Sequence, residues 1–344
     1  MILIVYGTRP EIIKLFPLIN ELKAQGLPFK TAFTGQHLDL YEDVRDLIPE
    51  PDYLLNSDYH DKASGLGDSF CRIGASMEHL LKKSRFDIIV VQGDTTSACA
   101  VAQIGFYNHI KVAHVEAGLR TYDVSSPFPE EINRRFISQV SGFNFAPTAK
   151  AKEHLESEGA QNIYLTGNTI VDSLDFFNLP ASHENQCLIT LHRRENHHVM
   201  PELFRQINET AARYPGLEFV FPIHPNPNVR KHRGILEGSN LHVIEPVGYQ
   251  DMLGYLSRAL FIISDSGGLQ EEAVYFGKKI LIVRNNTERP ETVETGLGRL
   301  VGHDILGNLD WVNVKADSPS ENPFGDGKAS KRIADIIRRQ LYDN

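Results

Sequence analysis

The chain has 344 residues, of which 41% are hydrophobic and 23% are charged, and its formal net charge is -9. This composition is that of a globular protein and excludes extensive disorder, and the length predicts two domains because one hydrophobic core rarely organises so many residues. The negative charge argues against nucleic acid or an anionic membrane as a partner, since both recruit an excess of Lys and Arg.

The first half of the chain alternates short apolar runs with helical stretches. Runs rich in β-branched and aromatic residues occupy 2–6, 29–34, 86–91, 111–115, 144–146 and 163–166. Buried parallel strands have this pattern. The first run is followed at once by the charged GTRPE and is too short for a signal peptide, and no run approaches the ~18 apolar residues of a membrane span. We therefore expect a cytoplasmic protein.

The GTRPEIIK segment (7–14) follows the first predicted strand. Thr8 can cap a helix whose first position is Pro10, and Arg9 and Lys14 would flank the positive helix N-terminus, where an anion is favoured. The alternative is an ordinary strand-to-helix turn in which Glu11 complements the helix dipole.

Three carboxylates follow later strands of the first half: Asp94 in QGDTTS, Glu116 in HVEAGLRT and Glu130 in SPFPEE. Each has a structural alternative. Asp94 could cap a helix that begins near Thr95. Glu116 could pair with Arg120, and Glu130 suits the first turn of a helix.

After a polar stretch at 179–186 the strand pattern restarts, with apolar runs at 187–191, 217–221, 241–245, 260–264 and 279–283. His192 and His224 follow the first two of these runs and would face the first-half carboxylates across a cleft. The segment HRRENHH lacks the HExxH spacing, and its two arginines would repel a cation, so we expect no metal. Three widely spaced cysteines likewise predict neither a zinc site nor a disulfide framework.

The segment DSGGLQEEA (265–273) follows the run at 260–264. The backbone N–H groups that would open its helix belong to Ser266, Gly267 and Gly268. Such an arrangement can cradle a diphosphate. Glu271 and Glu272 would fall in the first turn, where a carboxylate could accept from both ribose hydroxyls or simply complement the dipole. Arg289 follows the next strand and could reach the same edge.

These elements predict an α/β fold of two Rossmann-like doubly wound domains, 1–168 and 169–327, with the ligand in the cleft between them. The segment 315–328 looks like a linker, and 328–344 has one apolar helical stripe. No GxGxxG motif opens the first predicted strand–helix unit, and the sequence contains no GxxxxGK[ST] motif, so neither a nicotinamide cofactor nor P-loop chemistry is expected.

The motifs taken together resemble the non-hydrolysing UDP-N-acetylglucosamine 2-epimerase family. They are, in order, GTRPEIIK, GQH, QGDTTS, HVEAGLRT, SPFPEEINRR, TLHRREN, PIHPNPNVR, DSGGLQEEA and TERPET. The resemblance implies the GT-B architecture with the active site in the interdomain cleft, and a last helix that packs back on the first domain. It also implies a homodimer that interconverts UDP-GlcNAc and UDP-ManNAc for cell-surface polysaccharide synthesis.

The chemistry of the sugar restricts how the configuration at C2 can be inverted. The C2 hydrogen of the sugar is not adjacent to a carbonyl, so its direct removal is prohibitively slow. Breaking the C1–O bond gives an oxocarbenium-like centre that acidifies this hydrogen, and a positioned carboxylate can then complete elimination of UDP to a 2-acetamidoglucal. UDP adds back with C2 inverted, so the route needs no cofactor.

The resemblance assigns roles to residues of this chain. The side chains that match the family's acid/base and catalytic residues are Asp94, Glu116, Glu130 and His192. Its substrate-binding residues are Arg9, Lys14, His224, Ser266, Gly267, Gly268, Glu272 and Arg289. It also implies an allosteric UDP-GlcNAc site that includes Gln36 and His37, but Asp39 stands where a glutamine is expected, and 61–68 has no evident matching arginine.

The same motifs are compatible with other functions. The sugar could carry a modification, as in a 2,3-diacetamido uronate or a 6-deoxy N-acetyl sugar. The chain could be a GT-B glycosyltransferase or a hydrolysing epimerase that releases free ManNAc. A silent binder of sugar nucleotides is disfavoured, because all four chemical side chains are present.

Overall fold

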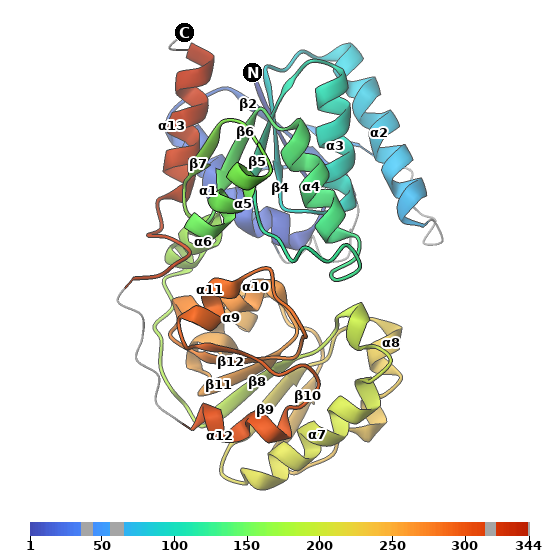
Figure 1. Ribbon diagram of the computed structural model, residues 1–344, viewed down its shortest axis with the longest axis vertical. Coiled ribbons are helices and arrows are strands. Elements are labelled where there is room, and N and C mark those ends of the chain that lie inside the picture. Colours follow the sequence, from blue (N-terminus) through green and yellow to red (C-terminus); the bar gives the residue numbers. More distant parts are fainter. Residues whose placement is uncertain (36–43, 56–64, 314–320, 343–344) are drawn as a thin grey trace. The chain divides into compact units, whose positions relative to one another are not determined.

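The computed structural model describes residues 1–35, 44–55, 65–313 and 321–342. The chain forms two compact units, which Figure 1 shows as ribbons: Met1–Phe176 with Phe324–Asn344, and Phe177–Pro323. Among the described residues, no helix combines the length and the apolar character needed to cross a membrane.

The first unit is built on a parallel sheet with the strand order β3-β2-β1-β4-β5-β6-β7. Its strands are β1 (Ile2–Tyr6), β2 (Phe29–Phe33), β3 (Tyr53–Leu54), β4 (Ile88–Gln92), β5 (Lys111–Val115), β6 (Phe143–Ala146) and β7 (Ile163–Leu165). Parallel neighbours require crossover helices, and these cover both faces of the sheet.

The helices of the first unit are α1 (Arg9–Ala24), α2 (Leu66–Lys83), α3 (Thr96–Tyr107), α4 (Glu130–Val140), α5 (Ala149–Ser157), α6 (Thr169–Phe177) and α13 (Ala329–Tyr342), with the short 3-10 turn η2 (Arg45–Leu47). Helices α2, α3 and α4 lie side by side, and α1 packs with α13 (Figure 1). The fully buried Met77, Ile89 and Val101 lie in the core between α2, α3 and the sheet.

The second unit repeats this plan with the order β10-β9-β8-β11-β12-β13. Its strands are β8 (Gln186–Thr190), β9 (Glu218–Pro222), β10 (Leu241–Ile244), β11 (Phe261–Ser264), β12 (Lys279–Ile282) and β13 (Gly298–Leu300). Its helices are α7 (Met200–Arg213), α8 (Pro227–Arg230), α9 (Tyr249–Arg258), α10 (Gly267–Tyr275), α11 (Pro290–Glu294) and α12 (Leu309–Val312), with η3 (Arg194–Asn196), η4 (Arg233–Ile235) and η5 (Leu306–Asn308).

The predicted fold class of two doubly wound parallel domains is confirmed. Every predicted strand is present, with its ends shifted by no more than about two residues. The sequence prediction omitted β3 and β13, which are very short and partly exposed edge strands. Such strands do not produce the continuous apolar run that identifies a buried strand.

The boundary between the units lies after Phe176, whereas we expected it after residue 168. The difference arises because α6 packs against α1: the Ser173 hydroxyl donates to the Ile13 carbonyl at 2.5 Å. Asp172 on α6 in turn accepts hydrogen bonds from the backbone N–H groups of Ala329 and Ser330, at 3.2 and 2.8 Å. The start of α13 is thereby tied to the first unit.

His114 lies on β5 with its side chain fully buried, and its Nε2–H donates to the Gly93 carbonyl at 2.8 Å. Burial lowers the pKa of this imidazole from 6.5 to about 4. Above pH 6.5 the ring is neutral in both the folded and the unfolded chain. Between pH 6.5 and about 4 the unfolded chain binds a proton that the folded chain does not, so acidification favours unfolding.

We predict that His114→Gln, which keeps an N–H donor and does not titrate, flattens the loss of stability on acidification. The difference in the free energy of unfolding between pH 7.5 and 4.5 should shrink by up to about 3 kcal/mol, measured by urea unfolding. The exposed His79→Gln on α2 is the control and should retain the wild-type dependence. Equal pH dependence in wild type and His114→Gln would contradict the assignment.

Candidate functional site

The candidate residues gather where the strand order of each sheet reverses. In the first unit, the strands that follow β1 lie on one side of it and those that follow β4 lie on the other side of the sheet. In the second unit, β8 and β11 are the corresponding adjacent pair. Loops that leave the carboxyl ends of such adjacent strands diverge and create a crevice in which ligands of doubly wound sheets bind. The segments GTRPE, QGDTT, LHRREN and DSGG all begin at these strand ends.

The first helix of the first unit begins one residue earlier than expected. Arg9 is its first residue, so Pro10 takes the second position, and Thr8 is the N-cap. Glu11 is buried and accepts from the backbone N–H groups of Gly7 and Thr8 at 2.8 and 2.7 Å. The Thr95 hydroxyl donates to its other oxygen at 2.7 Å. Burial raises the pKa of Glu11. Glu11 therefore links the loops after β1 and β4, beyond complementing the helix dipole.

Glu116 follows β5 and forms a buried ion pair with Lys14 of α1. The Gln92 side chain also donates to Glu116, at 3.0 Å. Glu116 has a φ of 66°, in the left-handed region that non-glycine residues rarely occupy. Such a conformation persists only where surrounding contacts enforce it, and the buried contacts with Lys14 and Gln92 do so here. The alternative pairing of Glu116 with Arg120 is wrong, because Arg120 binds Glu158 at 2.7 and 2.9 Å.

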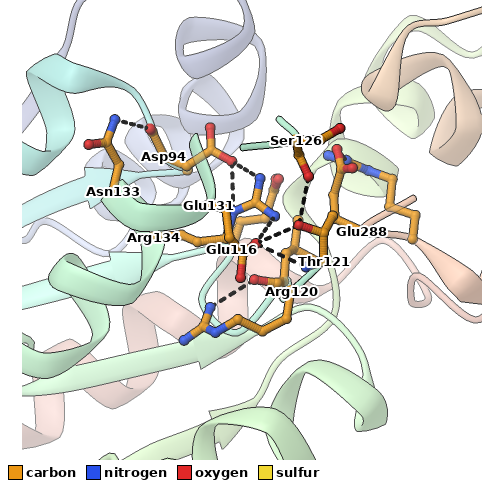
Figure 2. Close-up of polar contacts among 12 residues, drawn as sticks. Asp94, Glu116, Arg120, Thr121, Ser126, Glu131, Asn133, Arg134 and Glu288 are labelled. Atoms are coloured by element: carbon orange, nitrogen blue, oxygen red, sulfur yellow. Dashed lines mark hydrogen bonds and ion pairs between the residues drawn. The ribbon is translucent and has the colours of Figure 1, made fainter. Parts of the chain in front are cut away.

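Asp94 is held by α4 (Figure 2). The Nε and Nη2 atoms of Arg134 lie 3.1 and 2.6 Å from Asp94 Oδ2, and the Asn133 side chain donates to the Asp94 carbonyl at 2.9 Å. The suggested helix-capping role of Asp94 is wrong, because Thr95 is the N-cap of α3 and accepts from the Ala98 N–H at 3.0 Å. The carboxylate of Asp94 remains about one quarter exposed.

Glu131 organises the loop that carries these side chains, and it was not among the residues predicted from the sequence. It is fully buried, and it accepts from the Thr121 N–H at 2.9 Å, the Tyr122 N–H at 3.2 Å and Arg134 Nη1 at 3.3 Å (Figure 2). Arg134 thus bridges Asp94 and Glu131. The three-residue spacing of Glu131 and Arg134 on a helix was the available signal.

Glu130 begins α4 and is half-buried. The chain reaches it through two cis peptide bonds, Ser126–Pro127 and Phe128–Pro129. Asp94, Glu116 and Glu130 thus come from loops and a helix start that follow the adjacent strands β4 and β5.

In the second unit a buried aspartate positions His192. Asp265 is fully buried and accepts from the backbone N–H groups of His192 and Arg193, at 3.0 and 2.9 Å. The Asn196 side chain donates to it at 3.0 Å, and His192 Nδ1 lies 3.4 Å from Asp265 Oδ1. The rings of His192 and His224 stack, with centroids 4.9 Å apart and planes at 15°. The neighbouring strand ends therefore bring the two histidines together.

Arginine side chains surround the start of α10. Ser266 is its N-cap and Gly267 its first residue. A Cβ atom on Gly267 would lie 2.8 Å from Arg289 Nη1, 2.8 Å from Oε1 of its partner Glu288 and 3.3 Å from Arg193 Nη2. A Cβ atom on Gly268 would meet nothing within 4 Å. A helix N-terminus beside guanidinium groups favours an anion. Arg193, which the sequence marked only as an obstacle to a metal, was not predicted at this position.

We expected Glu271 and Glu272 in the first turn of α10, and this prediction is wrong. The helix begins at Gly267, and its first turn contains no acidic residue. Glu271 accepts from Arg289 Nε at 2.6 Å, and Arg289 also pairs with Glu288. Glu272 accepts from the Tyr249 hydroxyl at 2.8 Å. Both carboxylates lie beyond the reach of the dipole effect, which falls off within the first turn.

The predicted allosteric residues Gln36 and His37 lie outside the described part of the chain. Within that part, no group of three or more His, Cys, Asp or Glu side chains is arranged to hold a metal ion.

The chain is similar to known proteins along nearly its whole length. The model of the family "UDP-N-acetylglucosamine 2-epimerase" matches residues 20–338. A UDP-N-acetylglucosamine 2-epimerase of Campylobacter jejuni is 37% identical, over 98% of this chain and 97% of the relative. The Neisseria meningitidis enzyme bound to UDP-GlcNAc is 36% identical with a TM-score of 0.89, over 100% of both chains. The Methanocaldococcus jannaschii enzyme in complex with UDP-GlcNAc and UDP is 34% identical with a TM-score of 0.84, over 98% of this chain and 99% of that one.

We predict that Glu131→Gln destabilises the first unit by about 2–4 kcal/mol, because an amide NH₂ would face N–H donors that now bond to a buried carboxylate. Urea unfolding measures the loss. Glu153→Gln on the exposed side of α5 is the matched control and should change stability by less than about 0.5 kcal/mol. A neutral effect of Glu131→Gln would contradict its organising role.

Proposed function

The chain belongs to the UDP-N-acetylglucosamine 2-epimerase family, and from this premise we propose that it is the non-hydrolysing enzyme that interconverts UDP-GlcNAc and UDP-ManNAc. It would work in the cytoplasm, without a cofactor, to supply a precursor of cell-surface polysaccharide. The observation that carries the proposal is the convergence of Asp94, Glu116 and Glu130 at one edge of a parallel sheet in a chain similar to these epimerases along its whole length.

The proposed reaction proceeds by elimination and re-addition. The C1–O bond breaks, and its electron pair leaves with the diphosphate oxygen of UDP. A carboxylate removes the C2 hydrogen as a proton, and the C2–H electron pair becomes the C1–C2 double bond of 2-acetamidoglucal. Protonation of C2 from the opposite face and return of UDP to C1 give the epimer. No step of this route transfers a hydride to or from the sugar, so it needs no nicotinamide.

The carboxylates of the first unit would serve as the acid and base. Inversion at C2 requires proton transfer at both faces of the sugar, and a single fixed carboxylate would serve only one face. Arg134 fixes the direction of Asp94, and Lys14 with Gln92 fixes that of Glu116. Lys14 would therefore have two roles: it would orient Glu116 toward the sugar, and it would bind the diphosphate. Arg9, at the start of α1, is the other proposed diphosphate contact in this unit.

The second unit would hold the UDP. Backbone N–H groups of Gly267 and Gly268, with Ser266, His192 and Arg289, would stabilise the charge that develops on the leaving diphosphate. The Ser266 N–H donates to Ser264 Oγ at 2.9 Å, so a diphosphate would have to compete for it. Asp265 orients His192 through its backbone and ring, and His224 stacks against that ring. Glu272 would accept from the ribose hydroxyls. We propose that the units meet around the substrate as in the GT-B architecture, because the intermediate must keep its UDP until re-addition. We also propose a homodimer.

The first experiment is proton NMR of the protein with UDP-GlcNAc in deuterated water, with no nicotinamide or metal added. We expect UDP-ManNAc to form with deuterium at C2 of both sugars. Free ManNAc with UDP would instead identify a hydrolysing enzyme. Turnover only with a UDP sugar modified at C3 or C6 would assign a relative with another substrate, and transfer to an acceptor would assign a glycosyltransferase.

Neutral isosteres test the residue roles. Asp94→Asn, Glu116→Gln, Glu130→Gln and His192→Asn should each lower kcat by about 100-fold or more, since general acid–base catalysis contributes roughly 10²–10⁴-fold. The Kd of UDP, measured by calorimetry, should change far less for the three carboxylate variants. Asp123→Asn, at an exposed position of the same loop, is the control and should retain wild-type turnover. Undiminished kcat in all four variants would refute the proposed roles.

A further inference from the structure

Tyr249 makes a contact that the reaction described above does not use. It is the first residue of α9, it is buried, and its hydroxyl donates to Glu272 Oε1 at 2.8 Å. The ring packs edge-on against Phe177, with centroids 5.6 Å apart and planes at 73°. The phenol is therefore held in place from its apolar side while its hydroxyl donates to Glu272.

Glu272 lies on the side of α10 that a nucleotide would approach. It is four residues after Gly268, so both residues lie on one helical face, separated along the axis by about 6 Å. A Cβ atom on Gly268 would meet nothing within 4 Å, so space is open at the start of this face. A ligand whose phosphate binds the first N–H groups of α10 would direct its sugar along this face toward Glu272.

The two adjacent glutamates of α10 have different kinds of partner. Glu271 accepts from the guanidinium of Arg289, a charged group that also pairs with Glu288. Glu272 accepts from a neutral phenol, which orients the carboxylate without supplying a positive charge. A carboxylate offers about four acceptor sites, so one that binds the phenol can also accept both hydroxyls of a cis-diol.

We propose that Tyr249 is a positioning residue that aims Glu272 at the ribose diol and thereby makes the site selective for ribonucleotides over 2′-deoxyribonucleotides. The inference rests on the proposed function, because it takes UDP as the ligand of α10. The terminal torsion of a glutamate is broad, so loss of the hydrogen bond from Tyr249 would widen the range of orientations of the carboxylate and weaken the paired geometry that two adjacent hydroxyls require.

The test compares UDP with 2′-deoxy-UDP by calorimetry in wild type, Tyr249→Phe and Glu272→Gln. Wild type should bind UDP about tenfold or more tightly than 2′-deoxy-UDP, the size expected for a hydrogen bond to a charged group. Tyr249→Phe should reduce this ratio to about twofold, because it should weaken the binding of UDP and have little effect on the binding of 2′-deoxy-UDP. With UDP-GlcNAc, its effect should be on KM more than on kcat, because the ribose is remote from the reacting carbon.

A double-mutant cycle separates positioning from packing. In the Glu272→Gln background, adding Tyr249→Phe should change the UDP to 2′-deoxy-UDP ratio by less than about twofold, because the group that Tyr249 aims is already altered. Tyr255→Phe, on the same helix, is the matched control and should keep the wild-type ratio. If Tyr249→Phe fails to fold, Tyr249→His, whose ring keeps an N–H donor at a shorter reach, has the same expected loss of the ratio.

The outcomes distinguish this inference from the proposed function. Unchanged discrimination in a folded Tyr249→Phe protein, or equal affinities of wild type for the two nucleotides, would overturn the role of Tyr249 while epimerisation stands. A wild-type protein that neither binds UDP nor converts UDP-GlcNAc would overturn the proposed function itself, and with it this inference.

Discussion

The parallel pairing of every strand in both sheets is the constraint on which the rest of the structure depends. Parallel neighbours need a helical crossover, so each strand ends at the same edge of its sheet and releases its loop there. Residues as far apart in the chain as Arg9, Asp94 and Glu116 therefore converge at one edge without any contact between their own segments being required. The same constraint brings His192 near Ser266 in the second unit.

Buried carboxylates then determine the shape of these loops. Glu11, Glu131 and Asp265 are all nearly or fully excluded from solvent, and each accepts backbone N–H groups of the loop that it supports. Burial of a carboxylate costs free energy that an apolar side chain would not, so these contacts are a poor means of stabilising the fold alone. They do impose a single loop conformation, which a site that depends on the aim of other carboxylates requires.

The sequence was most informative where a signal is local or periodic. Buried strands are continuous apolar runs, so both sheets could be predicted, whereas the short edge strands β3 and β13 lack such a run. Motif order drew attention to the residues that follow the strand ends. It did not reveal which partner each would choose: Glu116 binds Lys14 from 102 positions away, and Asp94 binds Arg134 from 40 positions away. Such pairings depend on strand order and helix packing, which the spacing of residues in one loop does not encode.

The charges within each unit are largely matched before any substrate enters. Asp94 is paired with Arg134, Glu116 with Lys14, and Arg289 with Glu271 and Glu288. A buried charge without a partner would destabilise the fold, so this pairing is expected on stability grounds. It also limits how a leaving diphosphate is stabilised, because a guanidinium bound to two carboxylates contributes little net positive charge. The first N–H groups of any helix lack intrahelical acceptors, which leaves Gly267 and Gly268 at the start of α10 to donate to a ligand, whereas the Ser266 N–H donates to Ser264 Oγ at 2.9 Å. We therefore infer that the oriented backbone of α10, more than Arg289, supports the negative charge that develops on UDP.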